Sequence, residues 1–201
     1  RTYSLAEKMF LVGVVIHEIG HIYFPMTVNS DERQWTWMDE GLNSFLDSVA
    51  GYEWDPNMPW TRSLARDLVP YMVSSTQQPI MTQSDSINDL GSNAYGKPSA
   101  AYHLLRDTII GRERFDFALK EYARRWKFKR PTPADFFRTI EEASGTDLDW
   151  FWRGWFYTTD HVDISLDSIY RLKVDTKDPD IDLPRRRAER EAEPEVVGIG
   201  L

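Results

Sequence analysis

The chain has 201 residues, of which 41% are hydrophobic, 8 are tryptophan and none is cysteine, and its formal net charge is −8 at pH 7. Such a composition can form one domain with a sizeable core, or one domain with an appendage. The acidic balance argues against nucleic acid or an anionic membrane as the main partner, and the lack of cysteine excludes disulfides and thiolate chemistry. The compartment stays open, because chains without cysteine occur everywhere.

Neither a targeting signal nor a membrane span is evident in the sequence. No apolar run reaches the roughly 18 residues that a membrane-spanning helix needs. The chain begins RTYSLAEKMF, without an initiator methionine or a secretory signal, so we expect it to be a piece of a longer protein. An extracytoplasmic or membrane-attached parent is compatible with this expectation.

The first part of the chain has apolar residues at helical spacing. A helix is predicted over residues 4–24, where Ser4 can cap the start together with Glu7 in a capping box and Pro25 ends the pattern. A second helix is predicted over residues 36–51, with its terminal glycine as the stop signal.

Shorter helical patterns continue beyond these two helices. They cover residues 61–73, 96–110, 113–126, 131–145 and 147–157. The segment 131–145 carries Pro133 in its first turn and Gly145 at its end, as helices often do. Between the first two segments lies the irregular stretch 77–93, and long stretches of this kind inside a domain are often functional.

The last fifth of the chain has a different character. The segment VDISLDSIYRLKV, residues 162–174, alternates like a strand, and the tail after it is charged and poor in apolar residues. We therefore expect a mainly α protein in three parts. These are a helical domain portion over residues 1–160, the start of a β-rich segment over residues 161–175 and a disordered tail over residues 176–201.

Two histidines and a glutamate interrupt the apolar run VVIHEIGHIYF, residues 14–24. Positions i and i+4 share one face of a helix, so His17 and His21 point the same way and can bind one Zn²⁺ ion. Glu18 follows the first histidine and projects beside such a metal, where it can take a proton from a bound water. This is the HExxH pattern, and the alternative explanation is a chance match on a core helix.

A catalytic zinc ion usually has three protein ligands and an open position for water. Glu40 is the candidate for the third ligand, because eighteen residues separate it from His21 and it lies in the first turns of the second predicted helix. If that helix packs antiparallel to the first, Glu40 can face the metal. The alternative is an ordinary surface glutamate, since acidic residues are favoured near the start of a helix.

The motif HEIGH, followed by eighteen residues and a glutamate within WMDEG, resembles the gluzincin aminopeptidases of the aminopeptidase N family. The family pattern is HExxH-x18-E, with the second glutamate in a W-L-N-E-G-F phrase. Trp37, Glu40 and Gly41 match that phrase, and Asp39 stands where the family has asparagine. Pro25 and Met26 replace the usual Gly-Asn after the first helix, so the turn there is expected to differ.

A second match follows in NAYGKPSAAY, which resembles the Y-x-K-G-A segment of the family. There the tyrosine donates a hydrogen bond to the developing oxyanion, a role that the resemblance places on Tyr95, with Lys97 matching and Pro98 in place of glycine. Tyr102 is the rival, although no lysine follows it at that spacing. For either residue the alternative is a buried aromatic ring with a satisfied hydroxyl.

The resemblance covers about residues 5 to 173 and implies a fold, an activity and a cofactor. The fold is the helical C-terminal part of a thermolysin-like zinc metalloprotease catalytic domain. His17, His21 and Glu40 would bind one zinc ion per chain, with Glu18 as general base, and peptides would lose their N-terminal residues. The family's amine-anchoring G-x-M-E-N segment lies in an upstream β-subdomain and is not in this chain, so that subdomain is an implied partner.

Other functions and other residues stay open at this point. The fold also suits an endopeptidase or another hydrolase, or a non-catalytic zinc-binding module, and cobalt or manganese could replace zinc. His103 is more typical of a core or edge histidine than of a ligand, and His161 is expected in solvent. Asp39 could orient a ligand histidine, and the PRRRAER run indicates a solvated tail.

Overall fold

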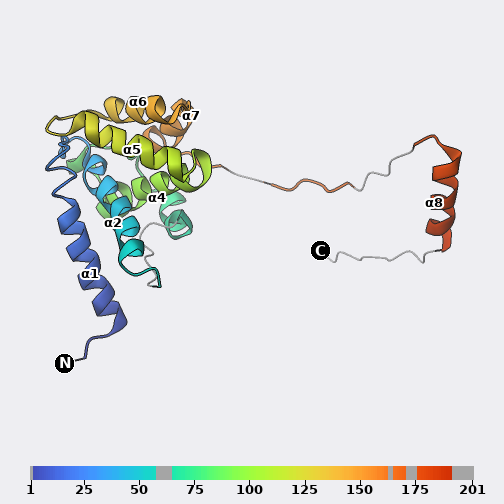
Figure 1. Ribbon diagram of the computed structural model, residues 1–201, viewed down its shortest axis with the longest axis horizontal. Coiled ribbons are helices and arrows are strands. Elements are labelled where there is room, and N and C mark those ends of the chain that lie inside the picture. Colours follow the sequence, from blue (N-terminus) through green and yellow to red (C-terminus); the bar gives the residue numbers. More distant parts are fainter. Residues whose placement is uncertain (1, 58–64, 163–164, 171–175, 192–201) are drawn as a thin grey trace. The chain divides into compact units, whose positions relative to one another are not determined.

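The computed structural model of the chain describes residues 2–57, 65–162, 165–170 and 176–191 (Figure 1). The chain divides into two compact units, Arg1–Val162 and Asp163–Leu201. The described residues contain helices and no strands, which confirms the mainly α class. The three-part division at residues 160 and 175 stays a prediction.

The first unit contains seven α-helices among its described residues. They are α1 Leu5–Gly20, α2 Glu40–Trp54, α3 Val69–Met72, α4 Lys97–Leu104, α5 Arg112–Trp126, α6 Pro133–Ser144 and α7 Asp149–Trp152. Shorter turns of 3₁₀-helix are η1 Thr36–Met38, η2 Ala65–Leu68 and η3 Ser84–Ser86. Wider π-turns are η4 Gly91–Gly96, η5 Leu105–Ile109 and η6 Arg153–Tyr157.

The predicted start of the first helix is confirmed in detail. The Ser4 hydroxyl accepts a hydrogen bond from the Glu7 amide, and the Glu7 carboxylate accepts one from the Ser4 amide at 2.7 Å. The helix ends at Gly20 instead of residue 24, because the chain turns from His21 onward. Most apolar side chains of α1 are exposed, and His17 is its one buried residue.

The second predicted helix differs at both ends. A 3₁₀-turn occupies residues 36–38, and α2 begins at Glu40 and continues through Gly51 to Trp54. The expected stop at Gly51 is wrong, because a glycine ends a helix where the chain needs a positive φ angle. Here the helix ends when Asp55 adopts an extended conformation at φ −152°.

The later helices follow the predicted order. Residues 65–72 of the segment 61–73 are helical, and residues 61–64 lie outside the described residues. Three predicted segments match within two residues at each end, namely α4 with its π-turn η5, α5, and α7 with its π-turn η6. The α6 helix has a capping box between Thr132 and Asp135, and Gly145 closes it at φ +64°.

The last part of the chain is described by itself. Residues 165–170 of the expected strand have no regular secondary structure, so that strand stays a prediction. A helix, α8 Pro179–Glu191, lies within the tail that we expected to be disordered. A tail with so few apolar residues cannot form a packed core, but it can still form one helix. Asp182 in the first turn binds Arg185 at 2.8 Å, and acidic residues near a helix start are favourable.

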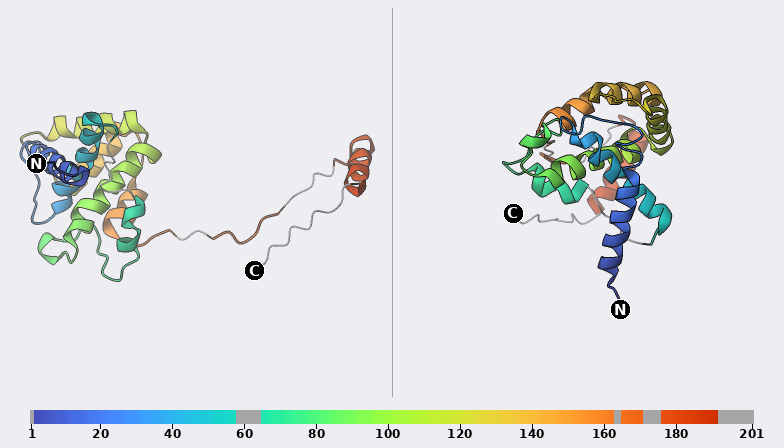
Figure 2. Two further views of the ribbon diagram at one scale, coloured as in Figure 1. Left: turned by 90° about the horizontal axis from the view of Figure 1, so that it is seen from below. Right: turned by 90° about the vertical axis from the view of Figure 1, so that its left-hand side faces the viewer.

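The core of the first unit is mainly aromatic and lies between α2, α4, α5, α6 and α7. Its largest buried rings belong to Trp37, Phe45, Tyr102, Phe115, Tyr122, Phe136, Phe137, Phe151, Trp152 and Phe156. The α5 and α6 helices pack side by side, and α1 packs along α2 and projects beyond the rest of the unit (Figures 1 and 2). Packing in the core therefore fixes the position of the start of α2, and packing against α2 positions α1.

Two glycines allow close packing around the start of α2. A Cβ atom at Gly20 would overlap the side-chain amide of Asn43, and one at Gly41 would lie 2.6 Å from Cγ of Pro98. Asn43 uses the same side chain to donate a hydrogen bond to the His17 carbonyl at 2.8 Å. The end of α1, the start of α2 and the start of α4 consequently meet at one place.

Candidate metal centre

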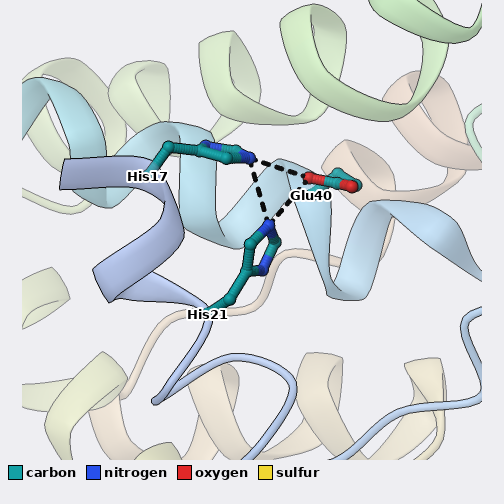
Figure 3. Close-up of side chains that lie close together, drawn as sticks. All are labelled: His17, His21 and Glu40. Carbon is teal, nitrogen blue, oxygen red and sulfur yellow. Dashed lines mark hydrogen bonds and ion pairs between the residues drawn. The ribbon is translucent and has the colours of Figure 1, made fainter. Parts of the chain in front are cut away.

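The meeting point of α1 and α2 gathers the three residues predicted as metal ligands. His17 and His21 lie one turn apart at the end of α1, and Glu40 is the first residue of α2 (Figure 3). The Nε2 atoms of the two histidines are 3.1 Å apart, and Glu40 Oε2 lies 3.1 Å from His17 Nε2 and 3.4 Å from His21 Nε2. Three donor atoms thus form a nearly equilateral triangle.

The size of this triangle fits a zinc ion. With ligand distances of about 2.0–2.1 Å and tetrahedral angles, neighbouring ligand atoms lie about 3.3 Å apart. The donor set also suits zinc, since two imidazole nitrogens and one carboxylate oxygen are common zinc ligands. The described residues His17, His21 and Glu40 could therefore hold a metal ion.

The far nitrogen of each histidine is occupied by a hydrogen-bond acceptor. Nδ1 of His17 donates to Oδ2 of Asp47 at 2.8 Å, and Nδ1 of His21 donates to the carbonyl of Phe24 at 2.9 Å. Asp39 Oδ1 also lies 3.0 Å from Nδ1 of His21. Because both Nδ1 atoms act as donors, both Nε2 atoms are available to bind a metal ion.

The carboxylates of the cluster favour a positive charge beside them. Hydrogen bonds to Asp47 and Glu40 raise the pKa of His17 to about 10, although burial opposes this. Burial alone would raise the pKa of Glu40, but hydrogen bonds from His17 and Tyr95 lower it below its usual value. Burial and the neighbouring Glu40 carboxylate raise the pKa of Asp39 to about 7. A proton on His17, or a metal ion, satisfies these carboxylates.

Tyr95 lies at the edge of the same cluster, and Tyr102 does not. The Tyr95 hydroxyl bonds to the Glu40 carboxylate, and its ring stacks against that of His17 with 6.0 Å between centroids. The π-turn η4 carries Tyr95 toward the end of α1. Tyr102 is fully buried among the aromatic rings of the core and contacts Phe45 and Phe136.

The remaining residues that the sequence analysis named are Glu18, His103 and His161. Glu18 is exposed on α1 directly after His17. His103 is outside the cluster and forms a 2.7 Å hydrogen bond with Ser48, and burial lowers its pKa. His161 is exposed beyond η6.

Asp47 is the functional candidate that the sequence analysis missed. It is buried, and it lies seven residues after Glu40, two turns further along the same face of α2. The signal that could have found it is the spacing of seven residues from Glu40, which places both carboxylates on one face of the helix, since a buried carboxylate needs a partner.

A second acidic group has a simpler explanation. Glu141, Asp147 and Asp149 lie close enough to hold a cation. However, Oε1 of Glu141 already accepts hydrogen bonds from the amide of Leu148 at 2.9 Å and from the indole of Trp152 at 3.2 Å. These contacts tie the loop before α7 to α6.

The fold and the cluster define a helical domain with a potential three-ligand metal centre of the HExxH-glutamate class. The model of the Peptidase family M1 domain matches residues 1–155, so the chain belongs to this peptidase family. No described helix is both long and apolar enough to cross a membrane.

Several curated aminopeptidases are similar to this chain. It is 26% identical over 165 residues to "Probable aminopeptidase 2" of Sulfurisphaera tokodaii, covering 76% of this chain and 20% of the relative. It is 27% identical over 164 residues to "Aminopeptidase N" of Lactococcus lactis, covering 76% and 19%, respectively. It is 30% identical over 148 residues to the human "Glutamyl aminopeptidase", covering 69% and 15%. The chain thus spans a fifth or less of these relatives.

Proposed function

We propose that this chain is the helical part of the catalytic domain of a zinc-dependent aminopeptidase. The observation that carries the proposal is the triangle of donor atoms from His17, His21 and Glu40, with edges of 3.1, 3.1 and 3.4 Å. Membership of the peptidase family and the names of the relatives support a metallopeptidase of the aminopeptidase type.

The three side chains of the triangle hold one zinc ion per chain in this proposal. Zinc, when bound, polarises a carbonyl and lowers the pKa of a coordinated water. Asp47 and the Phe24 carbonyl keep a proton on each Nδ1 atom, so that both Nε2 atoms face the ion. These residues act by orientation, and they do not touch the substrate.

Glu18 and Tyr95 carry the proton transfer and the charge stabilisation. Glu18 is exposed beside His17, where its carboxylate accepts a proton from the attacking water and delivers it to the leaving amine nitrogen. Tyr95 donates its hydroxyl hydrogen bond to the oxygen of the scissile carbonyl as negative charge develops there. Its present contact with Glu40 supports this role, because it keeps the hydroxyl at the edge of the cluster.

The substrates in this proposal are peptides that lose their N-terminal residue. An upstream β-subdomain of the longer parent supplies the backbone-binding strand and the group that holds the free amine. Two alternatives keep the same fold, namely an endopeptidase or other hydrolase and a non-catalytic zinc-binding module.

The metal is tested on the chain by mass spectrometry and chelator titration. About one zinc per chain is expected, with strong loss in Glu40→Ala and little change in Glu142→Ala, an exposed matched control. Preference for cobalt or manganese over zinc would overturn the identity of the metal. A folded wild-type chain that binds no metal would overturn the site.

The reaction is tested on the longer parent with free-amine and N-blocked peptides. We expect Glu18→Gln to abolish turnover while zinc stays bound, and Tyr95→Phe to slow it by roughly 10²–10³-fold, as loss of an oxyanion donor does. Tyr102→Phe is the matched control and should retain turnover. Faster cleavage of the blocked peptide would favour the endopeptidase, and zinc binding without any turnover would favour the binding module.

A further inference from the structure

Lys97 is a buried lysine without a carboxylate partner among the residues that the structure describes. It is 1% exposed, and burial is the one cause that shifts its pKa, with no contribution from a described Asp or Glu. In the favoured orientation of the Gln77 amide, its oxygen accepts a hydrogen bond from Lys97 Nζ at 2.9 Å. The indole ring of Trp155 lies 5.9 Å from the same nitrogen.

These two contacts leave the ammonium group incompletely satisfied. A lysine has three N–H donors, and Gln77 accepts from one of them. Burial lowers the pKa of Lys97 to about 8. A charged amine in such surroundings is favoured by an anion that reaches it.

A cavity of about 580 Å³ lies against this lysine. Its walls are mainly apolar and come from α3, α7 and η6, including Val69, Phe151 and Trp155. The volume is within the range of pockets that hold small organic ligands. None of the residues that form the metal cluster lines this cavity, although Lys97 follows Tyr95 by only two positions.

Two further titratable residues line the cavity, and both are exposed. They are Asp160 and His161, on the segment after η6. Because solvent reaches both groups, water screens their charges more than that of Lys97. Lys97 is therefore the charged group that is buried among apolar walls.

We propose that this cavity binds a small carboxylate carried on an apolar chain. The carboxylate pairs with the ammonium group of Lys97, and the apolar chain packs against Phe151 and Trp155. A neutral apolar ligand leaves the lysine unpaired, and an amine adds a like charge. A compact polyanion such as phosphate is disfavoured, because it would pair with one buried cation and place its remaining charge against apolar walls. The inference does not depend on the proposed peptidase activity.

The test compares three ligands of equal chain length, octanoate, octanol and octylamine, on the full 201-residue chain by calorimetry at pH 7. We expect octanoate to bind about tenfold or more tightly than octanol, because a charge-assisted hydrogen bond forms only with the carboxylate, and octylamine to bind weakest. Equal binding of octanoate and octanol, or no binding of octanoate, would overturn the proposal.

Variants separate the charge from the cavity. Lys97→Met keeps the length of the side chain and should abolish the preference for octanoate over octanol. Lys120→Met, at an exposed lysine of α5, is the matched control and should keep it. Gly154→Leu should weaken both ligands, because Gly154 lines the cavity and a Cβ atom there meets no heavy atom within 4 Å. A retained preference for octanoate in Lys97→Met would refute the pairing.

Discussion

Replacing Asp47 should weaken zinc binding more than replacing Asp39, although each carboxylate lies close to a ligand histidine. His17 has one acceptor for its Nδ1 proton, namely the buried carboxylate of Asp47 at 2.8 Å. His21 has the Phe24 carbonyl at 2.9 Å, which no side-chain substitution removes, in addition to Asp39 at 3.0 Å. Loss of Asp47 therefore removes the contact that orients the His17 ring, whereas loss of Asp39 leaves the His21 ring oriented by the Phe24 carbonyl.

The magnitude follows from the buried hydrogen bond. A hydrogen bond to a charged buried group contributes about 1.5–3 kcal/mol, which corresponds to roughly a 10- to 150-fold change in an equilibrium constant. Asp47→Ala should thus weaken zinc binding by about 100-fold, and Asp47→Asn, which keeps an acceptor but loses the charge, by about tenfold. Asp39→Asn should change it by less than about fivefold, because the Phe24 carbonyl stays in place.

The assay is competition for zinc between the chain and a chromophoric chelator at pH 7.5. Circular dichroism and urea unfolding of each metal-free variant confirm that the comparison is made between folded proteins. Zinc binding by a folded Asp47→Ala chain at wild-type strength would refute the orienting role of Asp47. Equal losses in Asp39→Asn and Asp47→Ala would show that the Phe24 carbonyl does not hold His21.

Three further predictions concern stability. Gly41→Ala should lower the free energy of unfolding in urea by about 1–3 kcal/mol, because its Cβ atom would lie 2.6 Å from Pro98. Gly13→Ala is the control and should raise this free energy by about 1 kcal/mol, because a Cβ atom there meets no atom within 4 Å. The reverse order would contradict the packing argument. Ser4→Ala should lower the helicity of α1 and the free energy of unfolding by about 1 kcal/mol, measured by circular dichroism and urea, and Ser75→Ala, at an exposed serine outside any helix, is the control. Lys97→Met should raise the free energy of unfolding by about 2 kcal/mol at pH 7, since burial moves the lysine pKa from 10.5 to about 8 and the bond to Gln77 offsets part of that penalty. Between pH 8 and 10.5 the unfolded wild-type chain binds more protons than the folded chain, so wild-type stability rises with pH and the advantage of the variant shrinks; an advantage that is constant with pH would refute the charge argument.

The helix ends that depend on local sequence signals were predicted correctly. The Ser4–Glu7 capping box, Pro133 and Gly145 act within one turn of backbone, and each lies at the helix end where it was expected. The stop at Gly51 failed because packing of α2 keeps that residue in helical conformation. The helix within the tail was missed because charge and low hydrophobicity indicate the lack of a core. They do not exclude a helix with a local ion pair such as that between Asp182 and Arg185.

In the candidate site, residue spacing predicts the metal ligands, whereas the acceptors that orient the two histidines depend on packing. Spacing of four residues on α1 is enough to place His17 beside His21, and the predicted third ligand needed only one assumption, that α2 packs on α1. The hydrogen bonds from the two rings to Asp47 and to the Phe24 carbonyl depend on where α2 and the turn after α1 lie in space, which no spacing rule states. Asp47 could still have been suspected from its position two turns after Glu40 on a buried face. The Phe24 carbonyl could not, because every residue has a carbonyl and only the fold selects the one that a histidine reaches.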